Sequence, residues 1–205
     1  MTRILIPYAT MAGSTAGVAY ALAEALQEHG LEADARPLSE EPSPQGYDAV
    51  IVGGPMIVGW HRGALAYVRR HRAAWATTPL ALFALAISLT QPAETVVDGV
   101  PIVVDPRLPQ PPARPGRLSL HERYAQLPRY VRPMLRAAGP VRPLSVALFG
   151  GRLELGRLPW WAVLFVLAAI KAPAGDRRNW EAIDDWAGQL VALLEAQEAR
   201  NRVAA

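Results

Sequence analysis

A short segment rich in hydroxyl groups and glycine lies near the amino terminus and carries the clearest chemical signal. It follows an apolar run and precedes an amphipathic stretch, so it is predicted to join a buried strand over Arg3–Ala9 to a helix over Ser14–Gly30. Backbone N–H groups, hydroxyls and the positive end of the helix dipole would there face one anion. We expect a phosphate group, held by Thr10, Met11, Ala12, Gly13, Ser14 and Thr15.

Other motifs fit this segment poorly. Gly13 lacks the partner glycines of a dinucleotide-binding fingerprint, and no Gly-Lys-Ser/Thr triplet follows it. Residues 13–17 have the spacing of a nucleophile elbow centred on Thr15, but that motif needs an acid and a histidine late in the chain, and the last histidine is His121. The chain has no cysteine, and its four histidines lack metal-ligand spacing. No catalytic residue and no metal site is therefore predicted.

The elements that position this loop follow from apolar periodicity. Strands alternate with helices early in the chain, which predicts a doubly wound, parallel α/β sheet. The further strands are expected at residues 32–37, 48–52, 80–87 and 144–149, and the further helices at 61–75, 160–170 and 180–200.

The pattern breaks between residues 92 and 143, a stretch with eleven prolines. Residues 96–100 contain Asp98-Gly99 and predict a small hairpin. Residues 109–115 are expected to be extended, and residues 120–136 helical despite Pro128. We interpret residues 1–205 as one domain that carries an insertion at 92–143, and so long an insertion is more often functional than idle.

Positive charge is concentrated in this insertion. The whole chain has a formal net charge of +3, yet Asp105–Pro143 holds eight arginines against two acids. Such a segment favours anionic partners, for example lipid head groups or acidic substrates; a solvated loop that keeps the protein soluble is the alternative. No nucleic-acid partner is predicted.

The longest apolar run covers Trp160–Ile170 and is too short to span a bilayer. Its leading tryptophans are typical of an interfacial segment, and a core helix is the alternative. We expect a cytoplasmic location, in solution or at the inner face of the membrane.

The loop resembles the phosphate loop of flavodoxins, whose pattern is Thr-x-Thr-Gly-x-Thr. Thr10, Gly13 and Thr15 match it, and Ala12 departs from it by lacking one hydroxyl. Loops Gly53–His61 and Ser88–Gln91 follow two later predicted strands. In the flavodoxin-like fold that this resemblance implies, a five-stranded parallel sheet of order 2-1-3-4-5 has helices on both faces, and these loops meet at one crevice.

The resemblance implies FMN as the cofactor. Trp60 is the candidate to stack on the isoalloxazine ring, with anchoring of the next helix as the alternative, and Met56 would line the same wall. Beyond the phosphate loop, the predicted FMN-binding residues are Gly54, Pro55, Met56, Trp60, Ser88, Leu89 and Thr90.

A narrower resemblance is to the menaquinone-dependent protoporphyrinogen oxidase branch of the flavodoxin superfamily. It is carried by Ile51–Arg62, by Tyr67–His71, by the strand and turn Leu80–Gln91, by Phe149–Leu153 and by Asp176–Arg178 with Trp180-Glu181. That branch implies an FMN-dependent oxidoreductase of heme biosynthesis that passes electrons from a porphyrinogen to a quinone at the membrane. Its insertion is shorter and less rich in proline than this one, which leaves substrate specificity open.

Two alternatives remain from the sequence. A soluble FMN electron carrier would need no substrate site, although flavodoxins are typically acidic and this chain is basic. A flavodoxin-like interaction module without FMN is the other, and Ala12 and Pro55 in the ligand loops favour it.

Overall fold

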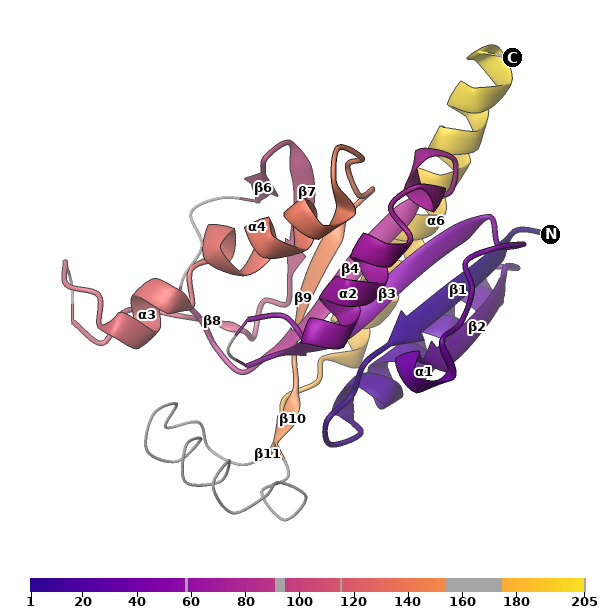
Figure 1. Ribbon diagram of the computed structural model, residues 1–205. Coiled ribbons are helices and arrows are strands. Elements are labelled where there is room, and N and C mark those ends of the chain that lie inside the picture. Colours follow the sequence, from indigo (N-terminus) through magenta and orange to yellow (C-terminus); the bar gives the residue numbers. More distant parts are fainter. Residues whose placement is uncertain (58, 91–94, 115, 154–174, 205) are drawn as a thin grey trace.

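The computed structural model describes residues 1–57, 59–90, 95–114, 116–153 and 175–204. Within them a seven-stranded sheet has helices on both faces (Figure 1). Its strand order is β2-β1-β3-β4-β9-β7-β6, and all neighbours are parallel except β6 and β7. The strands are β1 (Arg3–Tyr8), β2 (Glu32–Pro37), β3 (Ala49–Met56), β4 (Leu80–Ala86), β6 (Val96–Val97), β7 (Val100–Val104) and β9 (Val146–Gly150).

The flavodoxin-like α/β fold is confirmed, but the predicted number of strands is wrong. The expected order 2-1-3-4-5 is present as β2-β1-β3-β4-β9, and the insertion adds β7 and β6 beyond β9. The predicted hairpin is confirmed, because Asp98 and Gly99 turn with φ of 50° and 80°. The hairpin also joins the main sheet, because β7 pairs with β9 and covers what would have been an open sheet edge.

Two apolar cores lie on the two faces of the sheet. Successive side chains of a strand point to opposite faces, so Leu5 joins one core while Ile4 and Ile6 join the other. Helices α1 (Ser14–Glu28) and α6 (Trp180–Ala204) cover one face, and α2 (Arg62–Arg70) and α4 (Leu127–Ala138) cover the other (Figure 1). Val18, Leu22 and Leu26 of α1 are fully buried, as their spacing predicts.

The insertion folds as short elements that extend the sheet beyond β9 and cover the face on which α2 lies. The helix expected at 120–136 is interrupted, giving α3 (Leu120–Tyr124) and α4. Pro128 explains the break, because it lies in the first turn of α4, where no N–H is needed. Two-residue strands β5 (Leu89–Thr90) and β8 (Pro109–Gln110) pair in parallel, and β8 lies within the stretch expected to be extended.

Several other elements begin or end at residues different from those predicted. The helix expected at 61–75 is α2 followed by a 3₁₀ turn, η2 (Ala74–Ala76), and another such turn, η1 (Leu38–Glu40), follows β2. Beyond β9, β10 (Arg152–Leu153) pairs with β11 (Gly175–Asp176) before α6 begins. The run 160–170 lies outside the described residues. No helix among the described residues is long and apolar enough to cross a bilayer.

Candidate functional site

The carboxyl ends of four parallel strands meet at one edge of the sheet. Tyr8 of β1 pairs with Gly53 of β3, while Ala86 of β4 pairs with both Met56 of β3 and Gly150 of β9. The loops that follow these strands therefore lie at the same edge, which is the lower edge in Figure 1. Ligands of open parallel sheets bind at this edge, where the connections diverge to opposite faces.

The loop between β1 and α1 has the backbone of an anion cradle. Gly13 precedes α1 with φ of 83°, a left-handed conformation that glycine adopts without strain. The Thr10 hydroxyl accepts a hydrogen bond from the Gly13 N–H at 3.0 Å and stabilises the turn. The first N–H groups of a helix have no partner within that helix, so this turn presents them at the loop. A phosphate fits this chemistry.

The hydroxyl groups of the loop differ in their surroundings. Thr15 is only 1% exposed, whereas Thr10 and Met11 are exposed. The Ser14 hydroxyl accepts a hydrogen bond from the Arg152 N–H at 2.8 Å, and a hydroxyl that accepts one bond can also donate one. The segment after β9 is thus tied to the first residue of α1.

We predict that Gly13→Val weakens FMN binding by roughly 10- to 100-fold. A non-glycine residue held in the left-handed region costs about 1–3 kcal/mol, and the β-branched side chain makes relaxation to another loop conformation favourable in the free protein. Binding would then have to restore the strained loop. Isothermal titration of the apo-protein with FMN measures the change.

Gly30→Val is the matched control, since Gly30 has φ of 80° at the far end of the same helix with open space around it. It should lower stability and leave FMN affinity unchanged. Equal FMN affinity of the Gly13→Val variant and the parent protein would contradict the assignment of this loop.

The β3–α2 loop begins later than the sequence indicates. Residues 53–56 belong to β3 rather than to a loop, because they pair with Phe83–Ala86 of β4. Gly53 allows this: a Cβ there would lie 2.0 Å from the Phe83 ring. The predicted ligands Gly54, Pro55 and Met56 are therefore the last residues of the strand, and Met56 is buried.

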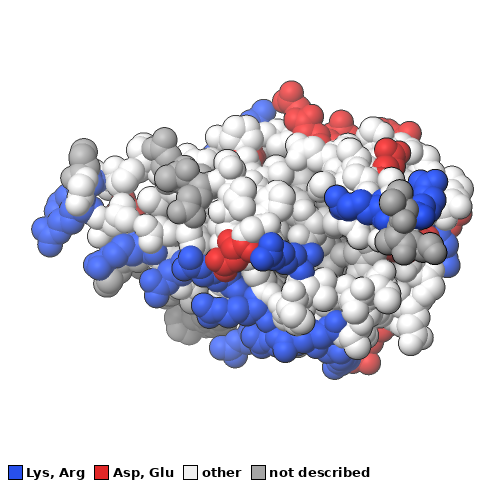
Figure 2. Space-filling model, turned by 90° about the horizontal axis from the view of Figure 1, so that it is seen from above, with Lys and Arg blue, Asp and Glu red and all other residues white. Residues whose placement is uncertain are grey.

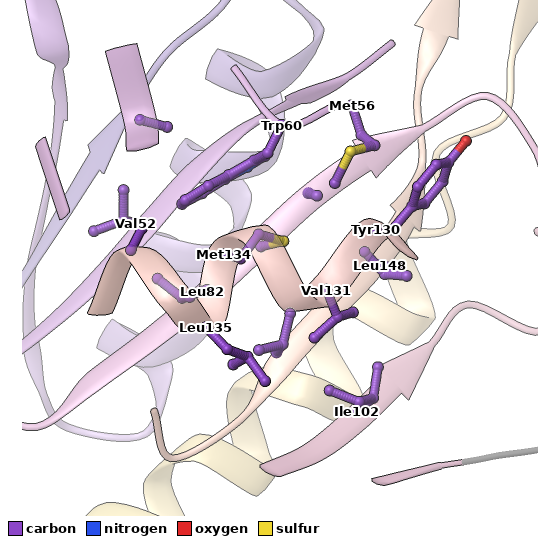
Figure 3. Packing of buried hydrophobic residues seen from close by; sticks show 14 of the residues in the cluster. Val52, Met56, Trp60, Leu82, Ile102, Tyr130, Val131, Met134, Leu135 and Leu148 are labelled. Atoms are coloured by element: carbon purple, nitrogen blue, oxygen red, sulfur yellow. The ribbon is translucent and has the colours of Figure 1, made fainter. Parts of the chain in front are cut away.

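Trp60 lies in the apolar core in this conformation. Its side chain is 3% exposed and packs on Gly54, whose Cβ position is 3.2 Å from the indole Nε1. Figure 3 shows Trp60 and Met56 in the same apolar cluster as Tyr130, Val131, Met134 and Leu135 of α4. This favours the anchoring interpretation, and stacking of Trp60 on a flavin ring stays a prediction. The Nε1–H is buried without a hydrogen-bond partner in the described part of the chain, so a ligand acceptor at this loop would satisfy it.

His61 begins α2 beside Trp60. Its Nδ1 accepts a hydrogen bond from the Gly63 N–H at 3.1 Å and caps the helix. Burial lowers the pKa of His61, which favours the neutral imidazole that this hydrogen bond requires. His61 therefore fixes the start of α2 and with it the end of the loop.

The turn after β4 is covered by the insertion. Thr90 donates from its N–H to the Ala125 carbonyl at 2.8 Å and from its hydroxyl to the Glu122 carbonyl at 2.6 Å, and Leu89 is fully buried. Ser88 hydrogen-bonds the Tyr130 hydroxyl, while burial, the larger effect, raises the pKa of Tyr130 to about 12. The side chains of Leu89 and Thr90 therefore anchor the insertion. Cofactor binding by Ser88–Thr90 stays a prediction, in which their backbone groups would contact the cofactor.

The insertion also reaches the β3–α2 loop. The Tyr124 hydroxyl of α3 lies 3.4 Å from the Cβ position of Gly59, which has φ of 89°. Arg129 lies over the Tyr124 ring, with its guanidinium carbon 5.8 Å from the ring centroid. Tyr124 and Arg129 thus stand where the insertion borders two of the three predicted ligand loops.

A fourth loop, after β9, was not predicted as part of the site. Asp105, fully buried at the end of β7, accepts hydrogen bonds from the Gly150 N–H at 3.2 Å and from the Asn179 Nδ2 at 3.0 Å. Gly150 is required here because a Cβ would lie 2.3 Å from the Arg177 carbonyl oxygen. The Gly150-Gly151 pair at the end of a predicted strand was the signal in the sequence that could have indicated it.

The surface around the insertion is basic. The arginines of α4 and of its approach, Arg123, Arg129, Arg132 and Arg136, are all exposed. Figure 2 shows basic side chains along one side of the molecule, continuing to the end where α3 projects, with the acidic ones mostly on the other side. Arg132 lies 3.7 Å from Asp98, an exposed pair that stabilises little.

Comparisons with known proteins give one family and several distant relatives. The family described as Flavodoxin domain matches residues 5–178. A protein of Escherichia coli (strain K12) named protoporphyrinogen IX dehydrogenase (quinone) is 21% identical over 204 residues, which cover 94% of this chain and 97% of that protein.

The similar solved structures are more distant. General stress protein 14 from Treponema denticola, in complex with FMN, aligns over 93% of this chain and 99% of its own at 13% identity and a TM-score of 0.42. Oxidised flavodoxin 1 from Bacillus cereus aligns over 40% of this chain and 60% of its own at 18% identity and a TM-score of 0.33.

Proposed function

Because the chain belongs to the flavodoxin domain family, we propose that it binds FMN at the carboxyl edge of the sheet and acts as an FMN-dependent oxidoreductase. The observation that carries the proposal is the left-handed Gly13 between β1 and α1, which gives the loop the shape of a phosphate cradle beside Ser14 and Thr15. Bound FMN would supply the redox chemistry at its isoalloxazine ring. The chain would hold the phosphate, orient the ring and limit access to it.

The experiment that tests FMN binding is the Thr15→Val substitution. Valine has nearly the same shape as threonine and lacks the hydroxyl, and one hydrogen bond to a charged acceptor is worth about 1.5–3 kcal/mol. We expect at least a tenfold loss of FMN affinity by titration of the apo-protein, and little change in affinity for riboflavin, which has no phosphate.

Thr77→Val is the matched control, because Thr77 is exposed between α2 and β4 and its hydroxyl donates to the nearby Ala74 carbonyl. If FMN and riboflavin lose affinity equally in the Thr15→Val variant, the hydroxyl does not hold the phosphate. If the parent protein binds neither flavin, the proposal fails, and an interaction module without FMN becomes the better description.

The substrate that we propose is a porphyrinogen, with a quinone as electron acceptor. The similar Escherichia coli protein carries this activity in its name. The charge of the insertion supports the assignment: Arg129, with Tyr124, borders the ligand loops, and guanidinium groups pair well with carboxylates such as porphyrin propionates. Anaerobic oxidation of protoporphyrinogen by the FMN-loaded protein, dependent on added quinone, is the expected result. If the bound FMN can be reduced but the protein does not turn over porphyrinogen, the soluble electron carrier is favoured.

A further inference from the structure

A cationic side chain from the far end of the chain lies beside the phosphate loop. Arg178 follows β11, yet its Nη1 lies 2.6 Å from where a Cβ on Gly17 would be. Gly17 is in the first turn of α1, and its N–H donates to the Gly13 carbonyl at 3.2 Å. The guanidinium therefore lies against the helix turn that begins at the predicted phosphate cradle, in space that any other residue at position 17 would occupy.

The side chain of Arg178 is held in this orientation from two sides. Its Nε donates to Asp176 Oδ1 at 2.9 Å and its Nη2 donates to Asp176 Oδ2. Its guanidinium carbon lies 4.4 Å from the centroid of the Trp180 ring, and the side chain is 13% exposed. Two of its nitrogens thus bind the carboxylate, while the third, Nη1, is the one directed at α1.

The Asp176 side chain is ionised at physiological pH and so remains a charged partner of Arg178. The hydrogen bond from Arg178 lowers the pKa of Asp176 to about 2, and the nearby charge of Arg152 acts in the same direction. Arg152 is itself joined to the loop, through its N–H and the Ser14 hydroxyl. The β10–β11 stem therefore contacts α1 at two successive points, Ser14 and Gly17, and brings two arginines and one aspartate there.

Building on the proposed function, we propose that Arg178 is a positioning residue for the FMN phosphate, which adds a fixed positive charge behind the first turn of α1, and that Asp176 sets its orientation. Four helical residues span only about 6 Å, so a charge beside Gly17 acts on an anion at the start of the helix without touching it. The stem is then part of the cofactor site, and the preference for FMN over unphosphorylated flavin depends on a residue more than 160 positions from the loop.

The test compares FMN with riboflavin in variants of the full chain. Arg178→Gln is expected to weaken FMN binding roughly three- to tenfold and to leave riboflavin affinity unchanged, since only FMN carries the phosphate charge. Arg178→Lys should retain most of the FMN preference. Asp176→Asn keeps one oxygen acceptor for Arg178 but removes the negative charge, so it should raise FMN affinity severalfold, again without an effect on riboflavin. Added salt should reduce each of these differences.

Arg200→Gln is the matched control. It removes the same charge from the end of α6, a region that lies at the opposite edge of the sheet, where Glu198 accepts a hydrogen bond from Thr2. Equal losses for both flavins in Arg178→Gln and Asp176→Asn would show that the pair only holds the stem in place and would overturn the proposal, as would unchanged FMN affinity in both. Should Arg178→Gln fail to fold, Arg178→Lys and Asp176→Asn decide. Absence of any flavin binding by the parent protein would instead remove the proposed function itself.

Discussion

Replacement of Asp105 by alanine is expected to lower the free energy of unfolding by about 2–6 kcal/mol. The carboxylate is fully buried and accepts hydrogen bonds from Gly150 N–H and Asn179 Nδ2, both of which are buried. Each buried donor that loses its partner costs about 1–3 kcal/mol. Urea unfolding of the two proteins measures the difference, and the midpoint should fall with little change in slope.

Asp105→Asn provides the control for this result. In the parent protein Arg107 N–H and Asn179 Nδ2 both donate to Oδ1, and the asparagine keeps that oxygen. Its amide nitrogen replaces Oδ2 and cannot accept from the Gly150 N–H. The loss of stability should therefore be intermediate. A change below about 0.5 kcal/mol in Asp105→Ala, typical of surface positions, would mean that Asp105 does not join the insertion to β9 and α6 as described.

The second large effect concerns the arginines of the insertion. We propose that the exposed face of α4 and its approach binds anionic membrane surfaces, where each arginine contributes about 1 kcal/mol. Replacing Arg123, Arg129, Arg132 and Arg136 by glutamine should then reduce binding to vesicles that contain anionic lipid by about a thousandfold. Co-sedimentation at low ionic strength measures binding, which should weaken as salt rises. FMN affinity should remain almost unchanged, since these side chains are not in the phosphate loop.

Two double variants, each lacking two arginines, test whether vesicle binding depends on where the charge lies or only on the net charge. Arg123 and Arg129 replaced together should weaken vesicle binding strongly, whereas Arg200 and Arg202, exposed at the end of α6, should have little effect when replaced together. Equal binding of the parent protein to neutral and anionic vesicles would exclude the electrostatic attraction. The same would follow if both double variants behaved alike.

Local patterns in the sequence determined the frame of the molecule. Continuous apolar runs predicted β1, β4 and β9 because a strand buried on both faces needs no polar alternation. The spacing of Val18, Leu22 and Leu26 predicted α1, and Asp98-Gly99 predicted the hairpin, since both depend on neighbours within a few residues. The order of threonine, glycine and serine after the first strand likewise predicted a phosphate loop, whereas the left-handed conformation of Gly13 was seen only in the structure.

Only the tertiary structure decided which distant segments complete that frame. Three contacts join residues between 32 and 161 positions apart. They are the pairing of β7 with β9, the hydrogen bonds of Thr90 to α3 and to the loop after it, and the contact of Arg178 with Gly17. Such contacts are selected by shape and by the satisfaction of buried polar groups, and neither leaves a periodic signal in the chain. For the same reason the sequence did not decide whether Trp60 stacks on a flavin ring or anchors the start of the next helix. Trp60 is buried beside Gly54 in the apolar cluster to which residues of α4 also belong, and the sequence around Trp60 does not encode that distant segment.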